Sequence, residues 1–310
     1  MFVRVLGAGA GGGFPQWNCT CRNCQSVRDG KPGFTPRTQS SLAVSADGQS
    51  WALLNASPDL RQQIAATPAL HAKPEHGLRN SPIKAVVMTN GDVDHMSGVI
   101  NLREAQPFTI YATRRVLGIV EDNSIFRILA DNMVPHEELP LGIARPLTGA
   151  GVDLGLDCEA FDVPGKIALY LEDASAGPSF GTASGDTIGL KITERATGKS
   201  FFYIPGCAQL DDALKARITG ASHVFFDGTL YDDDEMVRAG LMPKTGPRMG
   251  HISMSGANGS IATFRDLGIG RKIYVHINNS NPVLDEASQE RQTVEAAGWD
   301  VGFDGMEVRL

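Results

Sequence analysis

Two carboxylates and a histidine follow an apolar run closely enough to bind one metal ion together. The apolar residues 83–88 precede Asp92, Asp94 and His95. A run of this length predicts a buried strand, and in α/β proteins ligands bind where such strands end. Carboxylate oxygen and imidazole nitrogen are common ligands of divalent transition metals. We therefore predict a metal site at the carboxyl end of this strand.

Further side chains are candidates for the same site. His276 ends a second apolar run, and Asp227 ends a third. A histidine at the end of a buried strand can be a hydrogen-bonded core residue, but a second loop that carries His95 and two carboxylates favours a metal ligand. His251 lies on a loop before an expected helix, a position that suits proton transfer or metal binding. Asp227 is a candidate to face the same cleft.

A cluster of cysteines, Cys19, Cys21 and Cys24, lies within six positions of a chain that has five cysteines in all. In a reducing compartment such a C-x-C-x-x-C cluster indicates a metal or redox site before it indicates a disulfide. Three thiolates in one tight loop suit tetrahedral zinc. We predict a zinc-binding loop at residues 19–24 with a fourth ligand from elsewhere; the alternative is three ordinary loop cysteines.

The glycine-rich segment 7–13 matches the G-x-G-x-x-G pattern of dinucleotide-binding proteins. That fingerprint requires a helix directly after the glycines, so that the helix N-terminus meets the pyrophosphate. Here the segment continues into Phe14, Pro15 and the cysteine cluster, where no helix can begin cleanly. A loop whose backbone approaches a bound group closely is the better interpretation. No residue is assigned to an organic cofactor.

Length and composition set the class of protein. A chain of 310 residues without a linker-like segment predicts one domain over residues 1–310 with a large core. The formal net charge of -7 and the lack of a basic stripe exclude nucleic acid as an expected partner. No apolar segment reaches the roughly 18 residues that span a bilayer, and no signal-peptide pattern is present. We expect a cytoplasmic protein with no membrane partner.

Short β-type runs recur along the chain, with helical patterns between some of them. Expected strands cover residues 2–6, 41–44, 51–55, 83–88, 109–112, 167–171, 188–192, 200–204, 223–226, 272–276 and 301–303. Expected helices cover residues 58–66, 98–105, 114–129 and 284–297. This order predicts an α/β sandwich of two mixed sheets with helices outside.

Four motifs occur together at residues 19–24 (CTCRNC), 91–98 (GDVDHMSG), 203–207 (YIPGC) and 275–279 (VHINN). With this combination the chain resembles, over residues 1–310, a family of pyrroloquinoline quinone (PQQ) biosynthesis proteins in the metallo-β-lactamase-fold superfamily. The resemblance implies a four-layer αββα sandwich of two mixed sheets with flanking helices. It also implies a single metallo-β-lactamase-like domain that carries the zinc-binding cysteine loop at 19–24.

The metal-binding pattern of the superfamily is only partly present. The resemblance places Asn90 and Asp92 where the superfamily has its first two histidines, and Lys166 where a further histidine follows a Pro-Gly turn. Cys207 lies at or near the place of a bridging aspartate. A lysine ammonium repels a divalent cation, so Asn90 and Lys166 together remove the first of two metal sites. A mononuclear centre is therefore predicted.

The second metal site of the superfamily keeps its ligands. Asp94, His95 and His276 remain, with Asp92 as a further ligand or a hydrogen-bond acceptor beside them. Two histidines and a carboxylate are the ligand set of non-haem Fe(II) oxygenases, whereas two-metal hydrolysis needs a pair of ions. The resemblance implies an iron- and oxygen-dependent hydroxylase of a tyrosine-derived PQQ precursor, with Fe(II) at the active site and a separate structural Zn(II).

The same resemblance implies roles for other residues. Lys166 would pair with a carboxylate of an acidic substrate, and His251 and Asp227 would transfer protons or orient groups. The three clustered cysteines would hold the structural zinc. In related proteins a histidine completes that zinc site, and its position here is Asn279, which is the candidate fourth ligand.

Two alternative functions remain open. The chain could carry or transport PQQ or its precursor with a vestigial metal site, or it could be a metallohydrolase with a rearranged centre. The expected partners are molecular oxygen, PQQ itself and a small-molecule or short peptide-derived PQQ precursor. A homodimer is the candidate assembly.

Overall fold

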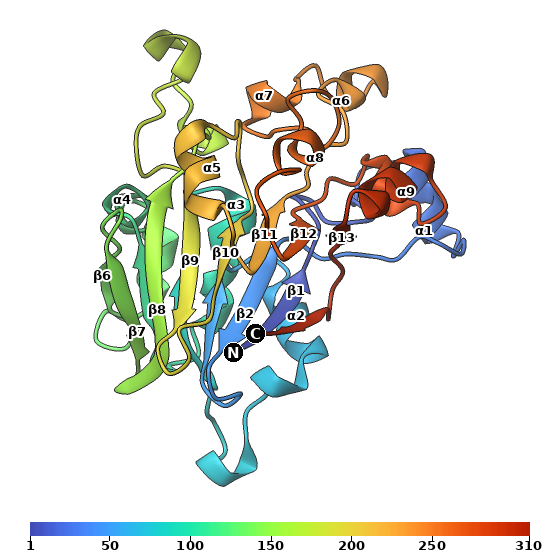
Figure 1. Ribbon diagram of the computed structural model, residues 1–310. Coiled ribbons are helices and arrows are strands. Elements are labelled where there is room, and N and C mark those ends of the chain that lie inside the picture. The colour runs from blue at the N-terminus through green and yellow to red at the C-terminus, as the bar shows by residue number, and fades with distance from the viewer.

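Two seven-stranded sheets pack face to face at the centre of the molecule (Figure 1). The computed structural model describes residues 1–310, apart from the side chain of Pro178. Across the first sheet lie β14 (Glu307–Arg309), β1 (Phe2–Gly7), β2 (Ser41–Ser45), β3 (Trp51–Leu54), β4 (Ile83–Val87), β5 (Thr109–Ala112) and β6 (His136–Glu138). Across the second lie β13 (Trp299–Val301), β12 (Arg271–Val275), β11 (His223–Asp227), β10 (Ser200–Ile204), β9 (Ile188–Glu194), β8 (Val152–Asp162) and β7 (Ala144–Gly149). Both sheets are mixed, because antiparallel pairs on one side give way to parallel pairs on the other.

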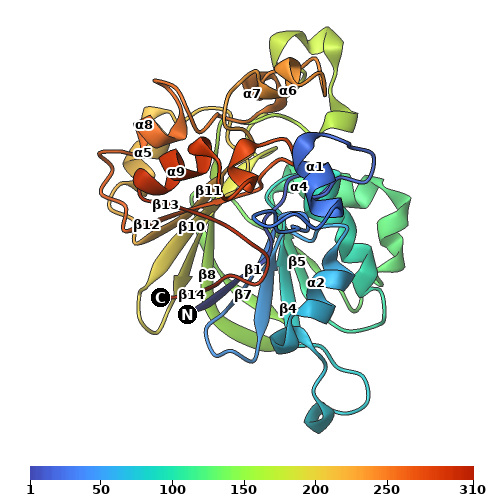
Figure 2. The ribbon, with the colours of Figure 1, turned by 90° about the vertical axis from the view of Figure 1, so that its right-hand side faces the viewer.

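Helices cover the outer faces of both sheets. The α-helices are α1 (Arg22–Arg28), α2 (Leu60–Ala66), α3 (Val93–Met96), α4 (Arg114–Asp122), α5 (Asp212–Ile218), α6 (Glu235–Arg238), α7 (Gly246–Met249), α8 (Ser260–Thr263) and α9 (Gln289–Ala296). The 3-10 helices are η1 (Pro68–Leu70), η2 (Pro74–His76), η3 (Ser97–Leu102), η4 (Ser124–Ile128), η5 (Leu169–Leu171), η6 (Ala174–Ser179) and η7 (Pro282–Leu284). Figure 2 shows α2 and α4 beside the first sheet and α5, α8 and α9 beside the second. This arrangement confirms the predicted four-layer αββα metallo-β-lactamase-like sandwich.

Alternate residues of the central strands face different cores. In β3, Ala52 and Leu54 pack between the two sheets, whereas Trp51 and Leu53 pack beneath the helices of the first sheet. The strand β10 divides its residues in the same way between the inner core and the core beneath α5 and α9. Strands that are buried on both faces appear in the sequence as continuous apolar runs, which is why these two were predictable.

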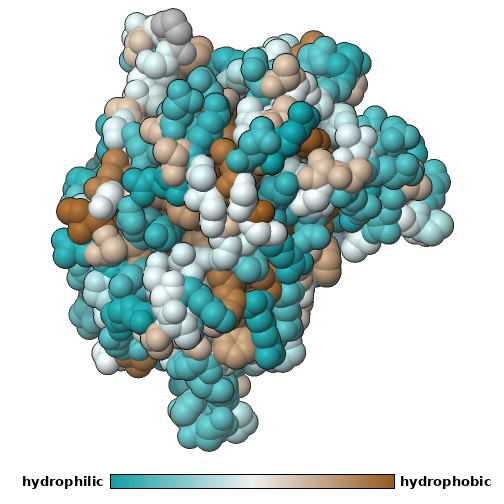
Figure 3. All heavy atoms as spheres, in the orientation of Figure 1, coloured by the Kyte–Doolittle hydropathy of each residue, from teal (hydrophilic) through white to brown (hydrophobic). Residues whose placement is uncertain are grey.

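The outer surface is mostly polar on the side shown in Figure 3. There, hydrophobic side chains form small groups among hydrophilic ones. Within the described part of the chain, no helix combines the length and the apolar character that a membrane crossing requires.

The structure corrects several expected elements. Residues 167–171 were expected as a strand, but they lie in a loop, and the last three of these residues form η5. The strands before and after this loop, β8 and β9, pair directly with each other and leave no place for another strand between them. The long strand β8 was not expected, because residues of low strand propensity, Asp, Glu and Gly155 (φ 68°), separate its buried residues. The expected helices 98–105, 114–129 and 284–297 are shorter or divided: they become η3, then α4 and η4, then η7 and α9.

Two expected strands end one residue early, at non-glycine residues with left-handed backbone. Asn55 (φ 65°) follows β3, and His276 (φ 56°) follows β12. This backbone region is uncommon for residues other than glycine and turns the chain sharply. Both turns lie at the edge of the sandwich where the loops after β4 and β11 begin, because Asn55 contacts Thr89 and His276 contacts Thr229.

We predict that Gly98→Ala destabilises the fold at this edge. An added Cβ would lie 1.8 Å from the backbone oxygen of Ser57, which cannot swing aside as a flexible side chain can. The expected loss in free energy of unfolding, measured by urea denaturation, is about 1–3 kcal/mol. Gly118→Ala in α4 is the matched control, because its added Cβ meets no described heavy atom within 4 Å, and it should stabilise the protein by about 0.5–1 kcal/mol. Equal stabilities of the two variants would contradict the prediction.

Candidate active site

A cavity of about 720 Å³ opens where loops from both sheets meet. Residues after β4 and β12, the glycine-rich loop and the cysteine loop all contribute to its wall. Among the predicted site residues, it is lined by Asp92, Asp94, His95, Lys166, His251, His276, Cys19, Cys21 and Asn279. Asp227 and Cys24 are fully buried behind this wall, so Asp227 does not face the cleft directly as predicted.

Asp94, His95 and His276 bring three ligand atoms together in the cavity wall. Asp94 Oδ2 lies 3.1 Å from His276 Nε2 and 3.5 Å from His95 Nε2. The two imidazole rings are buried, with centroids 5.1 Å apart in an edge-to-face arrangement. Although His95 Nε2 is buried, no described residue forms a hydrogen bond with it. A metal ion would complete the environment of this nitrogen.

Threonine hydroxyls hold the opposite nitrogen of each imidazole ring. Thr89 Oγ1 lies 3.2 Å from His95 Nδ1, and Thr229 Oγ1 lies 2.8 Å from His276 Nδ1. The Thr229 hydroxyl has two acceptors, Asp227 Oδ1 at 2.7 Å and the backbone oxygen of His276 at 2.9 Å, and neither can donate. Its single hydrogen goes to the closer one, Asp227 Oδ1, so its oxygen accepts the hydrogen of His276 Nδ1. With their δ nitrogens bound to threonine, both rings present their ε nitrogens to Asp94.

The charges around these three residues fit a cation. Burial alone would raise the pKa of Asp94, but His95 and His276 lower it below its ordinary value. Burial lowers the pKa of His95, whereas hydrogen bonding and attraction to Asp94 overcome burial and raise the pKa of His276. His276 Nε2 and Asp94 Oδ2 share a hydrogen bond at 3.1 Å, and a divalent ion that bound both atoms would displace its proton. The three residues fit a mononuclear metal site.

Asp227 supports His251 from behind the cavity. Asp227 Oδ2 accepts hydrogen bonds from His251 Nδ1 at 2.7 Å and from the backbone N–H of Cys207 at 2.9 Å. Its Oδ1 accepts from the hydroxyl and the backbone N–H of Thr229 at 2.7 and 3.0 Å. Burial alone would raise the pKa of Asp227, but His251 and these hydrogen bonds lower it. The carboxylate is thus charged, and the second ring nitrogen of His251 remains for the cavity.

Asp92 lies beside the three-ligand group but is engaged with the backbone. Its Oδ1 accepts a hydrogen bond from the N–H of Leu169 at 3.1 Å, and its own N–H donates to Asn90 Oδ1 at 2.9 Å. Its carboxylate does not belong to the group of ligand atoms formed by Asp94 and the two histidines. Of the two roles predicted for Asp92, this geometry favours the hydrogen-bond acceptor.

Lys166 points to the cavity, but it already has an anionic partner. Its Nζ lies 3.4 Å from Glu172 Oε1, and Arg248 holds both oxygens of the same carboxylate at 3.1 and 2.7 Å. Hydrogen bonds from Arg248, with the charge of Lys166, lower the pKa of Glu172 to about 2. Arg248 also stacks over Phe180 at 3.8 Å. This cluster fastens the loop after β8 to α7. A second cavity-lining cation, Lys244, forms no ion pair with any described residue.

The cysteine loop forms a compact cluster with Asn279. Asn279 Nδ2 lies 3.2 Å from Cys19 Sγ, 3.3 Å from Cys24 Sγ and 3.7 Å from Cys21 Sγ. Burial raises the pKa of the Cys24 thiol to about 12, so this thiol keeps its proton until a metal displaces it. The three sulfurs fit the predicted zinc site. With the carboxamide of Asn279 flipped, its oxygen, which carries the lone pairs that a metal needs, would take the fourth position.

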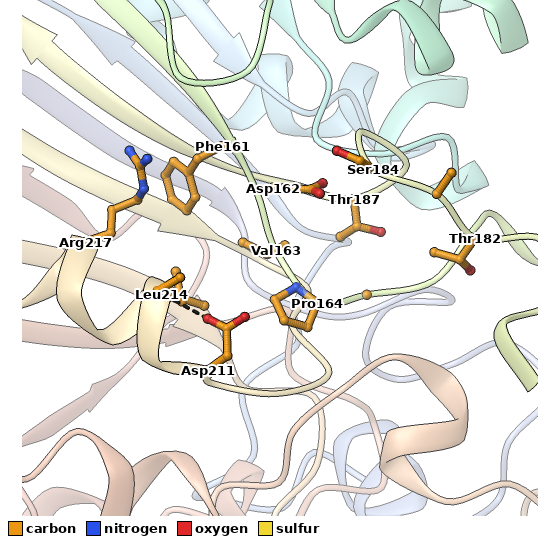
Figure 4. Close-up of a pocket in the computed structure, with 13 residues that line it drawn as sticks. Phe161, Asp162, Val163, Pro164, Thr182, Ser184, Thr187, Asp211, Leu214 and Arg217 are labelled. Atoms are coloured by element: carbon orange, nitrogen blue, oxygen red, sulfur yellow. Dashed lines mark hydrogen bonds between the residues drawn. The ribbon is translucent and has the colours of Figure 1, made fainter.

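A second cavity, of about 570 Å³, lies near the start of the loop that follows β8 (Figure 4). Its polar groups stabilise the fold. Asp211 accepts a hydrogen bond from the N–H of Leu214 at 2.8 Å and caps the start of α5. Arg217 pairs with Glu159. Asp162 accepts a backbone N–H at 2.8 Å. None of the clusters of three potential metal ligands among the described residues lies in this cavity, so the chemistry belongs to the larger one.

Several side chains of the site are not predicted by the sequence, namely Thr89, Thr229, Glu172, Lys244 and Arg248. Thr89 and Thr229 each lie two residues after the end of a strand, β4 or β11, and this position is the only signal that the sequence offers for them. Glu172 and Arg248 meet only because the loop after β8 folds back onto α7.

Known proteins resemble this chain along its whole length. A family model described as the beta-lactamase superfamily domain matches residues 50–277. The chain is 52% identical over 311 residues to coenzyme PQQ synthesis protein B of Methylorubrum extorquens, with all of both chains covered. It is also 52% identical over 311 residues to the protein of the same name in Bradyrhizobium diazoefficiens, with 99% of each chain covered.

Solved structures also resemble this chain over its whole length. The crystal structure of Zn²⁺-bound PqqB from Methylobacterium extorquens superimposes with a TM-score of 0.94 at 51% identity, over 100% of both chains. A diphosphatase of the PhnP family has a TM-score of 0.67 at 18% identity, with 100% of this chain and 97% of that chain covered. The second similarity concerns the fold alone.

We predict that Glu172→Gln loosens the loop between β8 and β9. The amide cannot form the ion pairs with Lys166 and Arg248, so backbone amides of residues 167–182 should exchange with deuterium severalfold faster than in the wild type. Since the pKa of Glu172 is held at about 2, below its ordinary value, the ion pairs are lost only as the pH falls through that value. The difference should therefore persist at pH 4.

The matched control is Glu121→Gln, which removes an exposed carboxylate that pairs with Arg114 on α4. This variant should leave exchange in residues 167–182 unchanged. Identical exchange in the wild type and Glu172→Gln would contradict a fastening role for Glu172.

Proposed function

Because the chain belongs to the family of coenzyme PQQ synthesis protein B, within the beta-lactamase superfamily, we propose that it acts in the biosynthesis of pyrroloquinoline quinone. We further propose that it is an iron- and oxygen-dependent hydroxylase of a tyrosine-derived precursor in the cytoplasm. The family relation supports the pathway. The geometry of Asp94, His95 and His276 supports the reaction.

The observation that carries the proposed reaction is the convergence of Asp94 Oδ2 with the ε nitrogens of His95 and His276. These three residues would hold Fe(II), and this ligand set leaves positions open for oxygen and substrate. When bound, Fe(II) supplies the one-electron chemistry by which one atom of O₂ enters a C–H bond and the other becomes water, with two electrons from an added reductant.

The cavity wall would hold the substrate by charge and by apolar contact. Lys166 and Lys244 line it, and an ammonium group pairs with a carboxylate such as those of amino-acid-derived precursors. Met236, Leu241 and Met242 supply an apolar part of the same wall. Methionine side chains adapt to aromatic rings and contact them favourably, so this part suits the ring of a tyrosine-derived molecule.

His251 is the residue that would move a proton. Asp227 fixes its Nδ1, and its ring stacks on that of His276 with a centroid separation of 5.2 Å. The remaining nitrogen, Nε2, would accept a proton from a substrate hydroxyl or return one to it. Asp227 acts through His251 as a positioning residue.

The hydrogen bonds of Asp227 also weigh against a two-metal hydrolase. Ligand atoms of Asp227, His251 and His276 lie close enough together to suggest a second metal site. However, four hydrogen bonds occupy the two oxygens of Asp227, and His276 directs its Nε2 to Asp94. A second ion would have to break these bonds, so the pair of ions that clamps a hydrolytic transition state is not favoured.

The first test is turnover with a defined metal. We expect the protein loaded anaerobically with Fe(II), and supplied with O₂ and ascorbate, to add one oxygen atom to a tyrosine-type precursor, as measured by mass spectrometry with ¹⁸O₂. Asp94→Ala and His276→Ala should abolish this product and the bound iron. His223→Ala is the matched control, because His223 lies at the opposite end of β11 from Asp227 and should leave both unchanged.

Two outcomes would contradict the hydroxylase. Full turnover with Zn(II) in the absence of O₂ would instead indicate a hydrolase. Tight binding of PQQ or its precursor without turnover, unaffected by Asp94→Ala, would indicate a carrier.

A second test separates proton transfer from metal binding. We expect His251→Gln and Asp227→Asn to lower kcat, His251→Gln by about 10²- to 10⁴-fold, while the iron content measured by elemental analysis stays at that of the wild type. Loss of iron in His251→Gln would mean that His251 is a ligand rather than a proton-transfer group.

A further inference from the structure

We infer that Asn55 and Tyr203 are positioning residues that set the ring of His95 from the interior of the sandwich. Such a role presupposes the proposed function, in which His95 Nε2 binds a metal. The two residues belong to different sheets, since Asn55 follows β3 of the first sheet and Tyr203 lies in β10 of the second. Both are fully buried.

The orientation of the Asn55 carboxamide is fixed by a donor that cannot be reassigned. The backbone N–H of Thr89 points to Asn55 Oδ1 at 2.9 Å. Because a backbone N–H can only donate, the atom that faces it must be the amide oxygen and not the amide nitrogen. The Asn55 NH₂ group consequently faces the hydroxyl oxygen of Tyr203 at 3.2 Å.

This orientation decides where the hydrogen of Thr89 goes. Thr89 Oγ1 lies 3.1 Å from the same Asn55 Oδ1, which is an acceptor only, so the hydroxyl donates to it. Having given its one hydrogen, Oγ1 can only accept from His95 Nδ1 at 3.2 Å. A neutral imidazole with hydrogen on Nδ1 has a bare lone pair on Nε2, which is the buried nitrogen without a described partner.

Tyr203 anchors this chain of hydrogen bonds to the second sheet. Its hydroxyl oxygen receives the Asn55 NH₂ group, and Ser40 Oγ lies 3.2 Å away as the acceptor for its own hydrogen. Burial raises the pKa of Tyr203, so the hydroxyl stays protonated. Without this oxygen, a buried NH₂ hydrogen of Asn55 would have no partner, and the carboxamide could turn.

The backbone around Asn55 holds the helix that carries His95. The N–H of Ala56 donates to the carbonyl oxygen of His95 at 2.8 Å, and the N–H of Gly98 donates to the carbonyl oxygen of Ala56 at 2.9 Å. The left-handed backbone of Asn55 thus directs its own side chain toward Thr89 and directs the N–H of Ala56 toward His95. Residues 55 and 56 therefore determine both the orientation of the His95 ring and the position of its main chain.

The test reads the hydrogen on His95 directly in the metal-free, ¹⁵N-labelled protein. Long-range ¹H–¹⁵N spectra should give the Nδ1–H form of His95 in the wild type. Asn55→Gly, which suits the left-handed backbone but lacks the amide, and Thr89→Val should increase the Nε2–H form. Thr89→Ser should restore the wild-type spectrum, because it restores the hydroxyl.

Metal affinity provides the second readout. We expect the affinity of the three-ligand site for Zn²⁺, measured by competition with a chelator, to fall about 10- to 100-fold in Asn55→Gly and Thr89→Val, and severalfold in Tyr203→Phe. As a test of folding, Co²⁺ is added in place of zinc at Cys19, Cys21 and Cys24. The cobalt–thiolate absorption should be the same in the wild type and in all variants.

Tyr111→Phe is the matched control, because the Tyr111 hydroxyl also joins the two sheets, through the carbonyl oxygen of Thr148 at 2.9 Å, but has no hydrogen bond to His95 or Thr89. Hydrogen on Nε2 of His95 in the wild type would overturn the inference. The same conclusion would follow if the Asn55 and Tyr203 variants had the His95 spectrum and the Zn²⁺ affinity of Tyr111→Phe. If the wild type bound no ion at Asp94, the proposed function would fail, whereas the spectra would still report the role of Asn55.

Discussion

A hydroxyl group has one hydrogen to donate, and this constraint organises the metal-ligating edge of the molecule. Thr89 donates to Asn55 and Thr229 donates to Asp227, so each hydroxyl oxygen can only accept from the histidine beside it. Both rings are thereby oriented before an ion arrives. Each of these hydrogen bonds contributes only about 1 kcal/mol to stability, yet together they determine which nitrogen atoms a metal can reach.

The two threonines also connect the site to the packing of the sandwich. Thr89 lies beyond β4 in the first sheet and Thr229 beyond β11 in the second, so the distance between the two histidines depends on how the sheets pack. The large residues of the inner core, with Tyr203 among them, set that packing. Ligands must be held to within about 0.5 Å for productive metal binding, and a rigid core gives that precision to loops that would otherwise move.

The sequence predicts the parts of this site that are local along the chain. The cysteine loop is contained in six residues, and Asp94 and His95 directly follow an apolar run, so their chemistry and approximate place could be inferred. Ring orientation could not, because it depends on hydrogen bonds between residues far apart, such as Thr89 with Asn55 and Thr229 with His276. For the same reason Asp227 was expected in the cleft, although it lies behind His251. The strand β8 was not predicted because Asp, Glu and Gly, which have low strand propensity, occupy the positions between its buried residues.

An anion that binds Lys166 must take the place of the Glu172 carboxylate, which already pairs with this lysine. A free lysine would capture any anion that reaches the cavity, and its affinity would fall steeply with salt. Lys166 instead begins in contact with a carboxylate of its own chain, and Arg248 keeps that carboxylate close. An incoming carboxylate gains only the difference between two similar ion pairs. Selection among anions at this position consequently follows their shape and the rest of their contacts more than their charge.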